Sequence, residues 1–208
     1  MQIKPGPAGK DRSFTAQARR AQIIEATIET IAEFGYANTS FGRIAERANL
    51  SSTRLISYHF AGKQELMAQV ATDLYLDIAE FMTKRLSGQH TAAGALRGYI
   101  EGNIEYIATH RAQMQALLDI FLSGVLSDGK RPTEALVSVN PVEQILRDGQ
   151  AGGEFRDFDP TIVAACIQRS IDAVPMLLQM RPDLDLAACA AEMTTVFELA
   201  TKSEATAE

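Results

Sequence analysis

The stretch NLSSTRLISYHFAGKQEL, residues 49–66, combines hydroxyl, basic and aromatic side chains with a recurring set of apolar residues. The apolar set is Leu55, Ile56 and Phe60, and its spacing predicts a short helix that packs on one side. The opposite side of this helix is polar and partly basic, although the whole chain has a formal net charge of −6. This contrast makes the stretch the first candidate for a functional surface.

Charge is unevenly distributed along the chain. Residues 1–63 hold nine lysines and arginines against five acidic residues, a balance of +4. Residues 64–208 hold eleven against twenty-one, a balance of −10. The asymmetry predicts a small basic end and a large acidic body with different functions.

The composition is that of an ordinary globular protein, with 46% hydrophobic and 22% charged residues among 208. A chain of this length can bury a substantial core in one medium domain or two small ones. The N-terminus lacks the apolar run of a signal peptide, and no stretch approaches about 18 uninterrupted apolar residues. We therefore expect a soluble cytoplasmic protein with no membrane partner. Cys166 and Cys189 form no CxxC pair, so we expect two buried, reduced thiols.

Helical patterns dominate the chain, and they predict an all-α fold of roughly nine helices. The segment 16–40 spaces its apolar residues at three and four, and Gly35 is a natural C-terminal cap. Thr39 or Ser40 caps a second, shorter helix, and Ser51 or Ser52 caps a third.

Proline positions organise the second half of the chain. Asn140 and Asp159 are each followed by proline, a combination that predicts a helix start. Pro175 falls inside a predicted helix of about residues 160–180, and we expect it to kink that helix.

Residues 39–60 have the plan of a helix-turn-helix, two short helices joined by a tight turn. One helix of such a motif enters the DNA major groove while the other crosses the phosphate backbone. Arg54 can bind guanine through two hydrogen bonds, and Thr53 can contact a thymine methyl group or a phosphate. Lys63, with the free N–H groups at the start of the next helix, suits a phosphate oxygen. The residues predicted to contact DNA are Thr39, Ser40, Arg43, Ser51, Ser52, Thr53, Arg54, Ser57, Tyr58, His59 and Lys63.

Two of these residues keep alternative interpretations. His59 lies next to Phe60, so either a packed or a phosphate-contacting histidine fits better than a metal ligand. Tyr58 fits a phosphate contact better than a base contact. We expect no metal site in the chain.

Four motifs in this region resemble the DNA-binding domain of the TetR family of bacterial transcriptional regulators. They are the first helix ending FGYANTS, the second helix IAERA, the helix end YHF and the next helix start GKQEL. Together they cover about fifty residues. The chain departs from the usual family pattern in two ways: it is one residue longer between IAERA and YHF, and Asn49 stands where glycine is usual.

The resemblance implies three parts. Residues 1–14 are expected to be a flexible basic arm, either a disordered tail or an arm for the minor groove. Residues 15–63 are expected to be the helix-turn-helix domain. Residues 64–208 are expected to be a larger helical domain for effector binding and dimerisation.

A dimer is expected because one helix-turn-helix covers only a short half-site of a near-palindromic operator. In the family that this chain resembles, the final two helices form a four-helix bundle with their twin. The alanine-rich helices of about 160–180 and 184–201 fit that role, although either could be simple core. The residues predicted at this interface are Ile167, Ile171, Val174, Leu178, Met193 and Phe197.

The resemblance also implies a pocket for a small effector in the middle helices, about residues 91–151. Few charges lie among the candidates, which favours a hydrophobic or aromatic effector; plain core packing is the alternative for each residue. Such an effector would release a repressor from DNA by favouring the DNA-incompetent state. The residues predicted to line the pocket are Tyr99, Tyr106, Met114, Leu117, Leu118, Phe121, Leu122 and Met176.

An enzyme and a ligand carrier are the alternatives from other classes. The histidines at 59, 90 and 110 have no ligand-like spacing, and no P-loop, GxSxG or GxGxxG motif occurs. We therefore expect no catalytic activity and no cofactor. A carrier with a vestigial DNA-binding head would bind ligand without showing salt-dependent DNA binding.

Overall fold

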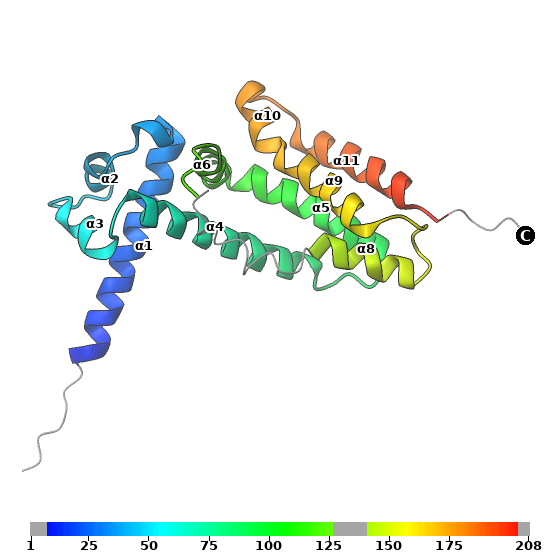
Figure 1. Ribbon diagram of the computed structural model, residues 1–208, viewed down its shortest axis with the longest axis horizontal. Helices are drawn as coiled ribbons and strands as arrows, with labels where there is room; N and C mark the ends of the chain where they lie inside the picture. The colour runs from blue at the N-terminus through cyan, green and yellow to red at the C-terminus, as the bar shows by residue number, and fades with distance from the viewer. Residues whose placement is uncertain (1–7, 127–140, 204–208) are drawn as a thin grey trace, which may run out of the picture. The chain divides into compact units, whose positions relative to one another are not determined.

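The computed structural model describes residues 8–126 and 141–203, with side chains from Thr15 onward, and these residues are helical almost throughout (Figure 1). The prediction of an all-α fold is confirmed. Asn140, predicted as a helix cap, lies outside the described residues. The helices are α1 (Ala8–Phe34), the 3-10 turn η1 (Tyr36–Asn38), α2 (Phe41–Arg47), α3 (Arg54–His59), α4 (Lys63–Leu86), α5 (Ala92–Thr109), α6 (Arg111–Leu122), α8 (Pro141–Ala151), α9 (Pro160–Asp172), α10 (Val174–Met180) and α11 (Leu186–Thr201).

The chain divides into two compact units. The head unit comprises Met1–Thr72 and Gln115–Arg131, and the body unit comprises Asp73–Met114 and Pro132–Glu208. Helices α4 and α6 each begin in one unit and end in the other. Helix α1 begins at Ala8, within the residues 1–14 predicted to be an arm.

The core of the head unit is apolar and comes from all of its first helices. Fully buried side chains from α1, α2 and α3 pack beneath the polar stretch that begins at Asn49, and Phe60 and Leu66 extend this core to the start of α4. Burying such side chains supplies the main stabilisation of a small helical unit. The large buried residues of the first three helices are Ile23, Ile31, Ile44 and Ile56.

Local signals explain how α2 and α3 begin and end. Gly35 has φ 76° and ends α1, and the Ser40 hydroxyl accepts a hydrogen bond from the Arg43 N–H at the start of α2, as predicted. Asn49 has φ 51°, the left-handed conformation that asparagine tolerates better than most residues. Asparagine can therefore stand in this turn where glycine is usual. Helix α3 begins at Arg54, and the Ser52 hydroxyl accepts the Arg54 N–H at 3.1 Å.

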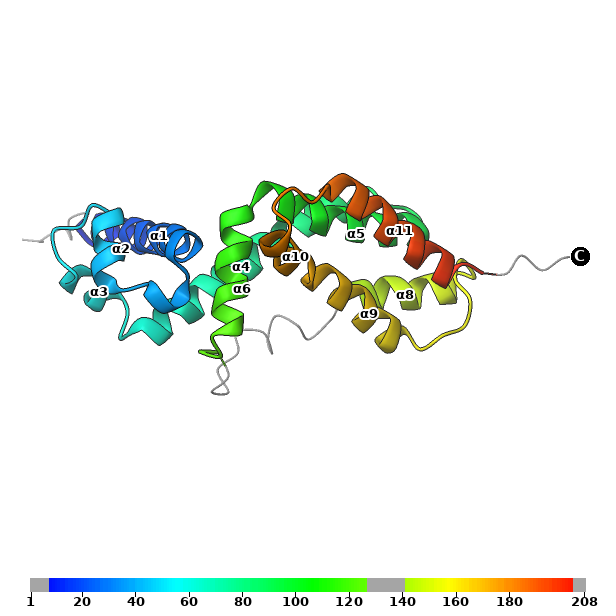
Figure 2. The same ribbon diagram turned by 90° about the horizontal axis from the view of Figure 1, so that it is seen from above.

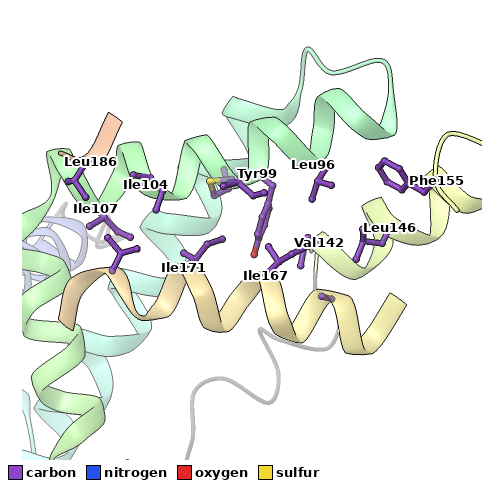
Figure 3. Close-up of a cluster of buried hydrophobic side chains, with 14 residues drawn as sticks. Leu96, Tyr99, Ile104, Ile107, Val142, Leu146, Phe155, Ile167, Ile171 and Leu186 are labelled. Atoms are coloured by element: carbon purple, nitrogen blue, oxygen red, sulfur yellow. The ribbon is translucent and has the colours of Figure 1, made fainter. Parts of the chain in front are cut away.

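The core of the body unit is a cluster of buried side chains from α5, α8, α9 and neighbouring helices (Figure 3). Helix α5 contacts α8, α9, α10 and α11, so it is the central element. Figure 2 shows α11 returning along the body unit in the direction opposite to α9. Leu96, Ile100, Val142, Leu146 and Ile167 in this cluster are fully buried.

The predicted kink at Pro175 is confirmed. Helix α9 ends at Asp172 and α10 begins at Val174, with Ala173 between them. The Asp159 carboxylate caps α9 by accepting the N–H groups of Thr161 and Ile162, as predicted. Residues Pro160–Met180 are long and apolar enough to cross a membrane by length and composition alone. Ile167, Ile171 and Val174 from this segment are instead part of the body core.

Candidate nucleic-acid interface and ligand cavity

Helix α3 presents a polar face to solvent. Arg54, Ser57 and Tyr58 are exposed on it, and Tyr58 retains 81% of its accessible surface. Ile56 on the opposite side is fully buried, and Leu55 is half-buried. The helix therefore has the apolar underside and polar outer face that the sequence predicted.

The predicted hydroxyl contacts lie in different environments. Ser40, Ser51 and Thr53 are exposed, whereas Ser52 is half-buried and its hydroxyl accepts the Arg54 N–H. Thr39 is only 3% exposed, and its hydroxyl donates to the Gly35 carbonyl. Thr39 therefore stabilises the turn before α2 in this structure, with its hydroxyl directed at the backbone.

Arg43 and Lys63 are both held beside aromatic rings. The Arg43 guanidinium lies 4.3 Å from the centre of the Phe34 ring, and Arg43 stays exposed. The Lys63 ammonium lies 4.1 Å from the Tyr36 ring and donates to the Tyr36 carbonyl at 3.0 Å. An ammonium has three donors, so this hydrogen bond leaves two for another acceptor.

A carboxylate lies close to the start of α4, where the sequence predicted a phosphate contact. The Glu65 carboxylate accepts the N–H of Ala61, two residues before α4, at 2.7 Å and adds a negative charge at this helix end. A phosphate bound here would therefore depend on the Lys63 ammonium more than on the helix terminus.

Arg20 on α1 fixes the end of α3, a role that the sequence did not indicate. Its guanidinium donates to the His59 carbonyl and to the Gln69 side chain, both at 2.7 Å. It also lies 4.3 Å from the centre of the Phe60 ring. Gln22, two residues further along α1, donates to the Ala48 carbonyl at the end of α2. Arg20 and Gln22 are thus positioning residues for both helices of the motif.

His59 is half-buried at the end of α3 and is influenced by the charges of Arg20 and Arg19. Burial and the positive charges of Arg20 and Arg19 lower its pKa below the ordinary value of 6.5. Burial also lowers the pKa of the Lys63 ammonium. An approaching negative charge, such as a phosphate, would favour the protonated and positively charged form of both side chains.

A cavity of about 210 Å³, open to solvent, lies within the body unit, and its lining residues Asp77, Glu80 and Lys84 are exposed. It is lined from α4 by Asp77, Glu80, Phe81 and Lys84, from α5 by Tyr106, and from the following segment by His110 and Gln113. The lining is thus more highly charged than the apolar pocket that the sequence predicted.

Of the residues predicted to line an effector pocket, Tyr106 is the one that lines this cavity. Tyr99 is buried in the body core, where its hydroxyl donates to the Gln168 side chain at 2.7 Å, and Met114 packs against that core. Leu117, Leu118, Phe121 and Leu122 belong to the head unit, and Phe121 and Leu122 are exposed. Met176 is also exposed, at 45%.

The predicted dimer residues divide into two groups. Ile167, Ile171 and Val174 are buried in the core of this chain, so they have no surface to offer a twin in this arrangement. Leu178, Met193 and Phe197 are half-buried against the same core. The exposed apolar residues of α9, α10 and α11 are instead Ile162, Met176, Leu177, Met180, Val196 and Leu199.

Sulfur and metal chemistry have little support in the structure. Cys166 and Cys189 are both free, but Cys166 is exposed, so the prediction of a buried thiol is wrong there. Cys189 is half-buried, and this burial raises the pKa of its thiol. Among the described residues, no group of three or more histidine, cysteine, aspartate or glutamate side chains could hold a metal ion.

These features define a helix-turn-helix protein whose basic head is followed by a helical body with a cavity. Residues 23–70 match the family model of bacterial regulatory proteins of the tetR family. The HTH-type transcriptional regulator BetI 1 of Chromohalobacter salexigens is 32% identical over 101 residues, which cover 48% of this chain and 50% of that protein. The chain therefore aligns with about half the length of this curated relative.

Solved structures share the fold over most of the chain. A transcriptional regulator from Saccharomonospora viridis in complex with choline has a TM-score of 0.79 at 19% identity, covering 90% of this chain and all of that one. AibR in complex with isovaleryl coenzyme A and operator DNA has a TM-score of 0.73 at 18% identity, covering 86% and 97%. The resemblance to the TetR family that the sequence motifs indicated is thus also found by the family model, over residues 23–70.

Proposed function

We propose that the protein is a ligand-responsive transcriptional regulator. It would act as a repressor that is released from DNA when a small effector binds the body unit. The observation that carries this proposal is the polar, partly basic face of α3 over a buried apolar underside, within a domain of the TetR family. A cytoplasmic location follows from this function. The relatives named above are regulators, and we propose no catalytic activity.

The proposed interface with DNA centres on α3. Arg54 is exposed at the start of α3, where a guanidinium can bind guanine through two hydrogen bonds. Ser57 and Tyr58 extend the same face, and Arg43 and Lys63 flank it with positive charge. Contacts of Arg43 and Lys63 with phosphates would position the protein on the DNA backbone without specifying sequence.

A homodimer is the form in which such a head would bind an operator. Two heads recognise half-sites one helical turn apart, about 34 Å, when the dimer has two-fold symmetry. We propose that α9 and α11 form the interface through their exposed apolar side chains, Ile162, Val196 and Leu199 among them. Leu199→Glu should then convert a dimer into a monomer, as measured by sedimentation, with the helical content unchanged.

The effector is proposed to act by shifting a population. A ligand that binds one arrangement of the body more tightly weakens DNA binding by its difference in affinity between the arrangements. Helix α6 contributes to both units, since it begins beside the cavity residue His110 and carries Asp119, whose carboxylate accepts the Tyr36 N–H at 3.2 Å in the head unit.

The experiment that tests the function is selection of bound sequences from random duplex DNA with the purified protein at moderate salt. Recovery of a near-palindromic site, bound with an affinity that falls steeply with salt, would support the proposal. Recovery of no sequence by a folded dimer, across salt concentrations, would contradict it and favour a ligand carrier whose head no longer binds DNA.

A further inference from the structure

We infer that the cavity of the body unit binds a small organic cation, such as a quaternary ammonium, between aromatic ring faces and a carboxylate. This inference rests on the proposed function, because it names the chemical class of the effector. It also modifies the prediction of a hydrophobic or aromatic effector, since an alkylated ammonium combines apolar surface with a positive charge.

Three aromatic rings meet at the cavity. The Tyr106 and His110 rings are stacked, with centres 4.0 Å apart and planes 7° from parallel. Phe81 contacts Tyr106 edge-to-face at 5.3 Å, and its centre lies 6.4 Å from that of His110. Clusters of rings such as this attract quaternary ammonium groups through their negative faces, at distances up to about 6 Å.

The protein's own cations do not occupy these ring faces. Elsewhere in the described residues, Arg20, Arg43, Lys63 and Arg156 each lie over an aromatic ring. No cationic side chain among those residues lies over Phe81, Tyr106 or His110 in the same way. Lys84, the cation in the cavity lining, donates instead to the Glu80 carboxylate at 2.6 Å.

The charges at the cavity favour a positive ligand. Asp77 and Glu80 supply two carboxylates, and the single ammonium of Lys84 is paired with Glu80. The Asp77 carboxylate has no ion-pair partner in the part of the chain that the structure describes. Burial and the negative charges of Asp73 and Glu80 raise its pKa, while His110 opposes this rise. The negative surroundings that disfavour the Asp77 carboxylate would stabilise a bound cation.

The size of the cavity restricts the ligand further. A volume of about 210 Å³ is below the roughly 300–1,000 Å³ of pockets for drug-sized ligands. A compact ammonium fits such a volume better than a long acyl chain. A ligand carrying phosphates would also bring negative charge toward Asp77 and Glu80.

The test compares choline with its neutral isostere, 3,3-dimethylbutan-1-ol, in which carbon replaces the charged nitrogen. Isothermal titration of the purified full chain at pH 8 should show choline binding about tenfold tighter than the alcohol. Tetramethylammonium should compete with choline. Equal affinity for choline and the alcohol, or no binding of either cation up to about 10 mM, would overturn the inference.

Variants locate the binding at this cavity. Asp77→Asn should weaken choline binding about tenfold, because it removes the unpaired carboxylate. Glu105→Gln is the matched control: it removes one negative charge from exposed α5 surface outside the lining, and affinity should change less than about twofold. Tyr106→Phe keeps the ring and should retain binding, whereas Tyr106→Leu should lose it. Equal effects of Asp77→Asn and Glu105→Gln would place the cation elsewhere and contradict the inference.

The DNA assay separates this inference from the proposed function. Choline binding at the cavity without release of DNA would support the cation site and contradict its role as an effector site. Release of DNA by a neutral or anionic compound, with no choline binding, would overturn the cation site and leave the regulator function supported.

Discussion

The head unit and the body unit both have apolar cores, but their polar anchors lie in different places. In the head unit, Arg20, Gln22 and Lys63 donate to backbone carbonyls at or near the helices of the helix-turn-helix. In the body unit, Gln150 and Arg156 donate to backbone carbonyls after α8 and at the end of α11, and neither residue lines the cavity. The anchors of the head therefore position the candidate DNA-binding face itself, whereas those of the body lie outside its cavity.

This difference suits the two proposed tasks. A DNA-binding face has to hold Arg54 and its neighbours in one register, because hydrogen bonds to base edges tolerate little displacement. A ligand cavity needs a stable frame and a few side chains of suitable chemistry. The anchors of the head unit fix the position of α3, and the body core leaves Asp77, Phe81 and Tyr106 at its margin.

The largest expected effect comes from opening the body core. Leu96→Ala removes a fully buried side chain from α5 and should lower the free energy of unfolding by about 3 kcal/mol. Urea unfolding followed by circular dichroism measures the change. Leu76→Ala, at a leucine that is 48% exposed on α4, is the control and should cost about 0.5 kcal/mol or less. Similar losses in the two variants would show that the body does not depend on this cluster.

The next effect comes from removing the main polar anchor of the head unit. Arg20→Ala loses two hydrogen bonds and the contact with the Phe60 ring, so unfolding of the head should become easier by about 2 kcal/mol. DNA binding should weaken for all sequences, because the end of α3 is released. Arg19→Ala removes the same charge but only a bond to Gln22, so a much smaller loss is expected. Hydrogen exchange of the α3 amides distinguishes the two variants.

A smaller and more selective effect is expected on the exposed face of α3. Arg54→Ala should lose discrimination at one base pair in each half-site, about tenfold in relative affinity. Lys63→Ala should weaken binding to all operator variants about equally and reduce the salt slope by about one. Affinities for a panel of single-substitution operators at several salt concentrations measure both. Identical profiles for the two variants would refute the assignment of Arg54 to a base.

The smallest effect is a dependence on pH. Because the pKa of His59 is lowered in the folded chain, the unfolded chain binds more protons as the pH falls through 6.5. The folded state therefore loses stability as the pH falls from about 7 toward the lowered pKa, and the loss is absent at higher pH. Comparison of urea unfolding at pH 7.5 and 5.5 should show a smaller loss in His59→Gln than in the parent. An equal loss would assign the dependence to other groups.

Features that depend on neighbouring residues could be predicted from the sequence. The caps at Gly35, Ser40 and Asp159 and the break before Pro175 each result from interactions within about one helical turn. The polar face of α3 follows from the spacing of its apolar residues over a few positions. The resemblance of residues 23–66 to a known DNA-binding domain added the fold of the head.

Features that depend on contacts across the chain could not be predicted in this way. Periodicity marks Ile167 and Leu199 equally as apolar, and only packing makes the first fully buried and the second 69% exposed. Likewise, no pattern in the sequence pairs Arg20 with the carbonyl of His59, 39 residues further on.

The sequence by itself determined the all-α fold, the helix-turn-helix head and the separation of a basic end from an acidic body. The tertiary structure decided the chemistry of the cavity, because Asp77, Glu80 and Phe81 come from α4 and meet Tyr106 from α5 only when these helices pack. Short-range signals set where helices begin and end, whereas the crossing and register of packed helices set which side chains meet. The charged, aromatic lining that replaces the expected apolar pocket is a property of that packing.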